Sequence, residues 1–140
     1  MKHFTLYTIG KIKEPWLKMA IAEYSKRLSS CVAFKTILAK DNAELEKKVL
    51  SQKNAIGLDA KGHTMTSEEW SSFLHEKWNL GGSHINFVIG GAEGLPQNLK
   101  KRLPLVSFSS MTFTHQITRL ILFEGVYRAV QIFQSGKYHK

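Results

Sequence analysis

The chain has 140 residues, 43% of them hydrophobic, so we expect one compact domain over residues 1–140 and no second domain. Its formal net charge is +9, from 20 Lys and Arg against 11 Asp and Glu. A charge of this sign favours a polyanionic partner such as RNA, but it is equally compatible with a surface that only confers solubility. The single cysteine, Cys31, excludes an intrachain disulfide and a cysteine-rich zinc site.

The first residues lead directly into an alternating, strand-like pattern. They show no signal-peptide pattern, and the sequence has no apolar stretch of bilayer length. We therefore expect a cytoplasmic protein without a membrane partner.

The first half of the chain alternates between strand and helix patterns. Residues 4–9 read as a strand that Gly10 ends, and Pro15 suits the first turn of a helix. Its apolar face is expected to include Trp16, Met19, Ala20 and Tyr24, widened by Leu17, Ile21 and Leu28. A β-branched, apolar strand at residues 32–38 follows, and then a helix through about residue 52 with a capping pair in Asp41-Asn42-Ala43-Glu44.

The second half continues the alternation. A short buried strand is expected at residues 55–59, and Thr66-Ser67-Glu68-Glu69 opens a helix that Gly81-Gly82 stops. The remaining elements are a strand at 85–89, a short helix from Pro96, a strand at 105–109 and a long helix at about 114–133. This order predicts an α/β fold, with a mostly parallel sheet covered by helices on both faces and ligands bound outside the carboxyl ends of the strands.

The last predicted helix is apolar around most of its circumference, which implies burial on two sides. One side would cover the sheet, and a two-fold related partner subunit best explains the other. The alternative is a central helix within a monomer.

A glycine-rich loop follows the strand at residues 85–89. The run Phe87-Val88-Ile89-Gly90-Gly91-Ala92-Glu93-Gly94 allows close approach of a ligand to the backbone. It matches neither the dinucleotide-binding fingerprint nor the Walker A loop. An ordinary strand-to-helix turn is the alternative.

A second loop, residues 107–115, offers hydroxyl groups and helical N-terminal amides beside apolar side chains. This combination suits a ligand with an adenine ring, a polar sugar and a charged tail. The alternative is a polar helix cap with Met111 and Phe113 in the core.

The C-terminal residues 136–140, together with Arg119 and Arg128, gather positive charge, an aromatic ring and an imidazole. Cations of this kind hold phosphates, and Tyr138 suits stacking on a base, although a frayed, solvated terminus is the usual alternative. The six histidines lack metal-ligand spacing and no nucleophile elbow exists, so we expect no metal and no hydrolase.

Several of these motifs together resemble one family, the bacterial 23S rRNA pseudouridine N3-methyltransferases of the SPOUT class. The resemblance spans essentially the whole chain and is carried by Gly10-Lys11, residues 23–28, residues 58–62, residues 87–94, residues 108–113 with His115, Tyr127-Arg128-Ala129, and Tyr138-His139-Lys140.

The resemblance implies a C-terminal trefoil knot, a homodimer, and S-adenosylmethionine as cofactor. The cofactor would lie against Leu58, Gly90, Ser109, Ser110, Met111, Thr112, Phe113 and Thr114. The substrate would be N3 of a pseudouridine in a stem-loop of 23S rRNA, methylated on the assembled ribosome, with one subunit's tail completing the partner's site. DNA is not an expected partner.

Within that reaction, His139 is expected to act as general base, because imidazole titrates near neutrality. Tyr138 would position the base, and Arg128 and Lys140 would contact phosphates. Three positions depart from the family pattern: Thr114 and Lys137 replace prolines, and Gly125 replaces a larger residue. The alternatives are a non-catalytic RNA-binding ribosome-assembly factor and a nucleotide-binding enzyme acting on a small molecule.

Overall fold

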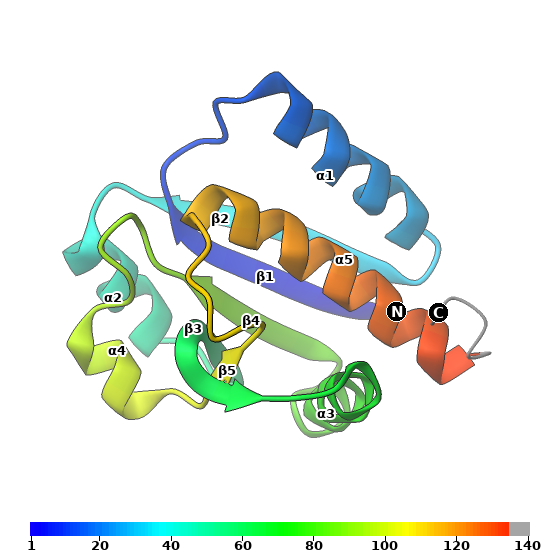
Figure 1. Ribbon diagram of the computed structural model, residues 1–140. Helices are drawn as coiled ribbons and strands as arrows, with labels where there is room; N and C mark the ends of the chain where they lie inside the picture. The colour runs from blue at the N-terminus through cyan, green and yellow to red at the C-terminus, as the bar shows by residue number, and fades with distance from the viewer. Residues whose placement is uncertain (135–140) are drawn as a thin grey trace.

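The computed structural model describes residues 1–134, which form one five-stranded sheet and five helices (Figure 1). The strands are β1 (Lys2–Ile9), β2 (Val32–Ala39), β3 (Ala55–Thr64), β4 (His84–Ile89) and β5 (Leu105–Ser107). The helices are α1 (Pro15–Leu28), α2 (Asn42–Leu50), α3 (Ser67–Leu80), α4 (Gln97–Arg102) and α5 (His115–Gln134). The predicted alternation of strands and helices is confirmed.

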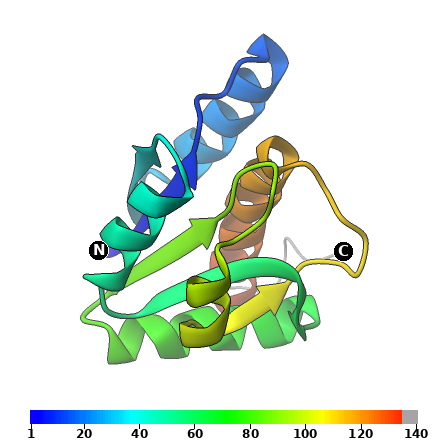
Figure 2. The same cartoon turned by 90° about the vertical axis from the view of Figure 1, so that its left-hand side faces the viewer.

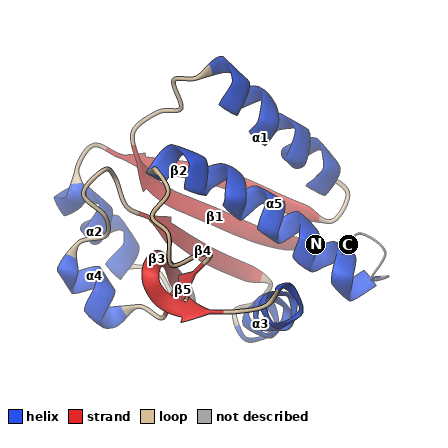
Figure 3. Ribbon diagram, viewed as in Figure 1, coloured by secondary structure: helices blue, strands red, loops and turns tan. Residues whose placement is uncertain are grey.

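All the strand pairs are parallel, in the order β2-β1-β4-β3-β5 (Figure 3). The first strand therefore lies inside the sheet, with β2 on one side and β4 on the other. In a parallel sheet every connection must return to the end where the previous strand began, so the carboxyl ends of all five strands lie at the same end of the sheet. The predicted loops gather at that end.

Helices cover both faces of the sheet, as predicted (Figures 1 and 2). On one face, α1, α3 and α5 pack over a core in which the ring of Phe4 is in edge contact with those of Phe87 and Phe123, each at 5.5 Å between centroids. On the other face, α2 and α4 bury Leu45 and Leu99 against the sheet. None of the helices within residues 1–134 has the length and hydropathy needed to cross a bilayer.

Local caps set the ends of two helices as the sequence predicts. The Asp41 carboxylate accepts from the backbone N–H of Glu44, and Thr66 and Glu69 form a reciprocal capping box. Helix α3 ends at Gly81, the position expected to stop it.

Two strands end two or more residues away from the predicted position. Strand β3 was expected to end at residue 59 but continues to Thr64, because it bends and pairs with Val106 a second time through His63. Gly62 permits this contact, since a Cβ there would lie 2.6 Å from the Leu105 carbonyl carbon. Strand β5 ends at Ser107 and not at residue 109, because the Ser107 hydroxyl bonds to the Ser109 backbone and turns the chain.

Helix α5 is buried on more than one side within a single chain, and the two-fold partner subunit stays a prediction. Helix α5 lies on the sheet between α1 and α3 of the same chain (Figure 1). Gly125 contributes to this packing: Trp70 Nε1 donates to its carbonyl at 2.9 Å, and a Cβ would lie 3.3 Å from that nitrogen. Its departure from the family pattern is therefore accommodated by close helix packing.

Candidate functional site

A cavity of about 1010 Å³ opens at the carboxyl ends of the strands. Four stretches of chain form most of its lining: residues 14–17, 58–61, 89–95 and 106–118. Its size and position are those of a ligand site in an open parallel sheet.

Three of these stretches carry the residues predicted to hold the cofactor. The lining contains seven of the predicted residues, namely Leu58, Gly90, Ser109, Met111, Thr112, Phe113 and Thr114. Ser110 is exposed and is not among the lining residues. Segments up to 56 residues apart in sequence thus meet at one site, because the ends of β3, β4 and β5 are neighbours.

The glycine loop after β4 turns back on itself. Gly91 and Gly94 form an isolated bridge, and Gly94 has a φ of +81°, which glycine adopts without strain. A Cβ at Gly90 would lie 2.5 Å from the Gly94 carbonyl oxygen and 2.6 Å from the Leu95 backbone nitrogen. Glycine is therefore required here by the loop itself, and the loop leaves its backbone open to the cavity.

The loop after β5 is held by its own hydroxyl groups. The Met111 backbone N–H donates to Ser109 Oγ at 3.0 Å, and the Ile117 N–H donates to Thr114 Oγ1 at 3.2 Å. Thr114 thus caps α5 in place of the family's proline. Met111 and Phe113 are 69% and 38% exposed, so the alternative that places both in the core is wrong.

The fourth stretch was not predicted as part of the site. Glu14, Trp16 and Leu17 line the cavity from the start of α1. The sequence placed Trp16 and Met19 on the buried face of α1, but they are 53% and 73% exposed. Leu17, Ile21 and Leu28 form the buried face instead. Apolar residues occupy both faces of this helix, so periodicity alone could not separate them.

Arg119 was expected on the basic surface near the C-terminus, and that prediction is wrong. The residue is 2% exposed, and its guanidinium Nη2 donates to the carbonyls of Ile9 at 2.7 Å and Gly10 at 2.6 Å. Burial lowers its pKa. Arg119 therefore joins the start of α5 to the end of β1, beneath the cavity.

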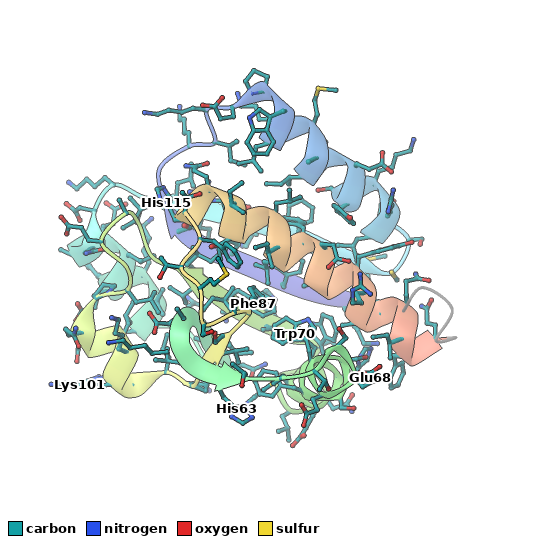
Figure 4. All side chains as sticks on the ribbon, viewed as in Figure 1. His63, Glu68, Trp70, Phe87, Lys101 and His115 are labelled. Atoms are coloured by element: carbon teal, nitrogen blue, oxygen red, sulfur yellow. The ribbon has the colours of Figure 1, made fainter. Side chains whose placement is uncertain are left out.

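The titratable groups at the cavity differ in environment. His115 lies at the first turn of α5 (Figure 4), where burial, followed by the charge of Arg119, lowers the pKa of its imidazole. Asp59 and Lys100 both line the cavity, with 3.9 Å between Oδ1 and Nζ. The neighbouring cation Lys101 points outward from α4 (Figure 4).

Of the predicted catalytic residues, the structure describes Arg128, which is not among the residues that line the cavity. Arg128 lies on α5 and forms an ion pair with Glu124 at 3.0 Å. Lys137, Tyr138, His139 and Lys140 lie outside the described residues. Within residues 1–134, no group of three or more His, Cys, Asp or Glu side chains is arranged to hold a metal ion.

Comparisons with known proteins agree on one family. The family model described as "Predicted SPOUT methyltransferase" matches residues 1–139. The chain is 44% identical over 140 residues to the ribosomal RNA large subunit methyltransferase H of Protochlamydia amoebophila, and the match covers 100% of both chains. It is 39% identical to the protein of the same name from Carboxydothermus hydrogenoformans, over 97% of this chain and 98% of that one.

Proposed function

Because the chain belongs to the SPOUT methyltransferase family, we propose that it moves a methyl group from S-adenosylmethionine to N3 of a pseudouridine in 23S ribosomal RNA. One observation carries the proposal: seven residues that the family resemblance implies for the cofactor, from three separate segments, line a single cavity. The names of the relatives support ribosomal RNA as the substrate.

The lining fits S-adenosylmethionine chemically. Leu58, Ile89 and Val106 give an apolar wall for an adenine ring, and Gly90 leaves backbone open for a sugar. Thr112, which also lines the cavity, carries a hydroxyl group that would add a polar contact. When bound, the cofactor supplies an electrophilic methyl group on a sulfonium. The part played by these residues is to fix its orientation and exclude water, which accounts for much of the acceleration in such a displacement.

The substrate nitrogen must lose its proton as the new bond to carbon forms. We propose His139 as the acceptor, Tyr138 as the residue that positions the base, and Arg128 and Lys140 as phosphate contacts. A neutral imidazole can take up the N3 proton near neutral pH. Cations fix the register of an RNA strand, and aromatic rings hold unstacked bases.

Four further features belong to the same proposal: a trefoil knot, a homodimer, action on the assembled ribosome, and a cytoplasmic location. The path of the chain supports the knot. From β5 at the edge of the sheet, the chain crosses back to Arg119, which bonds to the end of β1 two strands beyond β3. The dimer is supported by the family resemblance, which implies that the C-terminal tail of one subunit completes the site of its partner.

The experiment is transfer of labelled methyl from S-adenosylmethionine to assembled ribosomes that lack the modification, with free large subunits for comparison. Label on N3 of a single pseudouridine is expected. His139→Ala should lower the rate, whereas His63→Ala, which changes an exposed histidine on β3, should not. Ribosome binding without label would overturn the proposal and favour the RNA-binding assembly factor, which the net charge of +9 also suits.

A further inference from the structure

Trp16 differs from the other two tryptophans of the chain. Trp70 and Trp78 are 6% and 1% exposed, and their indole N–H groups donate to the carbonyls of Gly125 and His3. Trp16 is 53% exposed and lines the cavity. A large aromatic ring that faces solvent at a ligand site adds little to the core, so its position needs another explanation.

Hydrogen bonds from α5 hold the segment of chain that leads into α1, the helix that carries Trp16. The carbonyls of Ile9 and Gly10 accept from Arg119, and Gln116 Nε2 donates to the Lys11 carbonyl at 3.2 Å. Gly10 has a φ of +82°, which glycine adopts freely and which turns the chain toward α1. Helix α5 thus fixes the segment that precedes Trp16, and α1 places the indole at the cavity.

The other walls of the cavity are the segments proposed to hold the cofactor. A base that receives a methyl group must enter the same cavity and lie flat beside those segments, and it must leave its stack in the RNA to do so. The ring of a tryptophan offers such a base a stacking partner. Three exposed cations, Lys11, Lys13 and Lys18, flank Trp16 and suit the adjoining phosphates.

We propose that Trp16 is the residue on which the target base, or the unpaired base beside it, stacks when RNA enters the cavity. This inference rests on the proposed function, because it assigns an RNA base to the cavity. None of the three predicted cofactor segments includes α1. The inference assigns this helix a direct part in substrate recognition.

The test compares Trp16→Ala, Trp16→Phe and Met19→Ala. Met19 is 73% exposed one turn further along α1 and is not among the residues that line the cavity, so it is the matched control. For each variant, three quantities are measured: the affinity for S-adenosylmethionine by calorimetry, kcat/KM for ribosomes at saturating cofactor, and the mass in solution by sedimentation.

For Trp16→Ala, kcat/KM for ribosomes should fall roughly 5- to 150-fold, the range that removal of a stacking aromatic ring produces. Cofactor affinity and mass should not change, and Trp16→Phe should recover most of the loss. Met19→Ala should behave as the parent protein. If Trp16→Ala keeps the kcat/KM of the parent protein, the inference is wrong. It is also wrong if the loss of activity comes with a lower mass in solution or a weaker affinity for the cofactor. A parent protein that methylates no ribosome at all would instead refute the proposed function.

Discussion

Side-chain hydrogen bonds differ between the two ends of the sheet. At the amino end, side chains close the loops: Asn54 Nδ2 donates to the carbonyls of Lys77 and His84 at 2.9 and 2.8 Å, and Trp78 Nε1 donates to His3 at 2.9 Å. At the carboxyl end, the hydroxyl groups of Ser109 and Thr114 bond to the backbone of residues two and three positions further along the chain, beside the open cavity. Stability and ligand binding are therefore concentrated at opposite ends, so substitutions at one end should leave the other largely unaffected.

The largest effect is expected at the cavity. Gly90→Ala places a Cβ 2.5 Å from the Gly94 carbonyl, so the loop must move, and cofactor affinity should fall about 100-fold or more. Gly91→Ala, in the same loop and also at the cavity, is the comparison, because the nearest atoms to its Cβ would be those of the Ile9 side chain, at 3.5 Å, and the loop need not move. Calorimetric titration with S-adenosylmethionine measures both variants. Equal affinities would show that the loop is not part of the cofactor site.

Arg119 is an exception to this division between the two ends. It is a structural residue, yet it lies at the carboxyl end of the sheet. Arg119→Met leaves the carbonyls of Ile9 and Gly10 without this donor and should lower the free energy of unfolding by about 2–4 kcal/mol. Arg119→Lys should recover part of the lost stability. The free energy of unfolding of each variant is measured by urea denaturation. A methionine variant as stable as the parent would mean that the guanidinium is replaceable by apolar packing.

Asn54 tests the amino end in isolation. Its φ of +53° and its two hydrogen bonds should make Asn54→Ala about 2 kcal/mol less stable. Asn54→Gly removes the same hydrogen bonds but tolerates the backbone angle, so it should lose less. Thermal unfolding separates the two variants. Neither should change cofactor affinity, and a weaker affinity in both would contradict the division between the two ends.

The smallest effects concern two histidines. Burial lowers the pKa of His75, whose ring stacks on Phe133 at 3.9 Å, and that of His115 at the cavity. The unfolded chain takes up these protons first, near pH 6.5, so the stability falls as the pH drops below about 7 and levels off below the folded pKa. His75→Gln should flatten the pH dependence of stability measured by urea unfolding. An unchanged slope would exclude His75 as its source.

In the proposed cofactor site, a protonated His115 would add positive charge to a cavity that has to accept the cationic sulfonium of S-adenosylmethionine. Because burial lowers the pKa of His115, cofactor affinity should weaken only as the pH falls below the ordinary imidazole value of 6.5, and His115→Gln should remove that dependence in calorimetric titrations from pH 5.5 to 8. A dependence that survives the substitution would assign it to another group.

Local features of this fold were predictable and long-range ones were not. Thr66 and Glu69 are three residues apart, so their capping box can be recognised from spacing alone. The side of α1 that Leu17 buries depends on α5, about one hundred residues later, and the hydrogen bonds of Arg119 span 110 and 109 residues. The same holds for β3, whose bend over β5 depends on a strand more than 40 residues away.

The site divides in the same way. The glycine loop and the run from Ser109 to Thr114 could be identified because each is a continuous stretch with unusual composition. Trp16 could not, because a tryptophan at helical spacing fits a buried face as well as an exposed one. What decides between them is the packing of α5 on its neighbours.

The position of β1 also affects how the protein is made. A nascent chain can pair β1 with β2 early, but the other neighbour of β1, strand β4, follows about 80 residues later, and α5 is synthesised last. Until α5 leaves the ribosome, Phe4 lacks its contact with Phe123, and the part of that face between α1 and α3 is uncovered. Truncation within α5 should thus yield a chain that chaperones and proteases recognise, with neither a closed core nor a cavity wall.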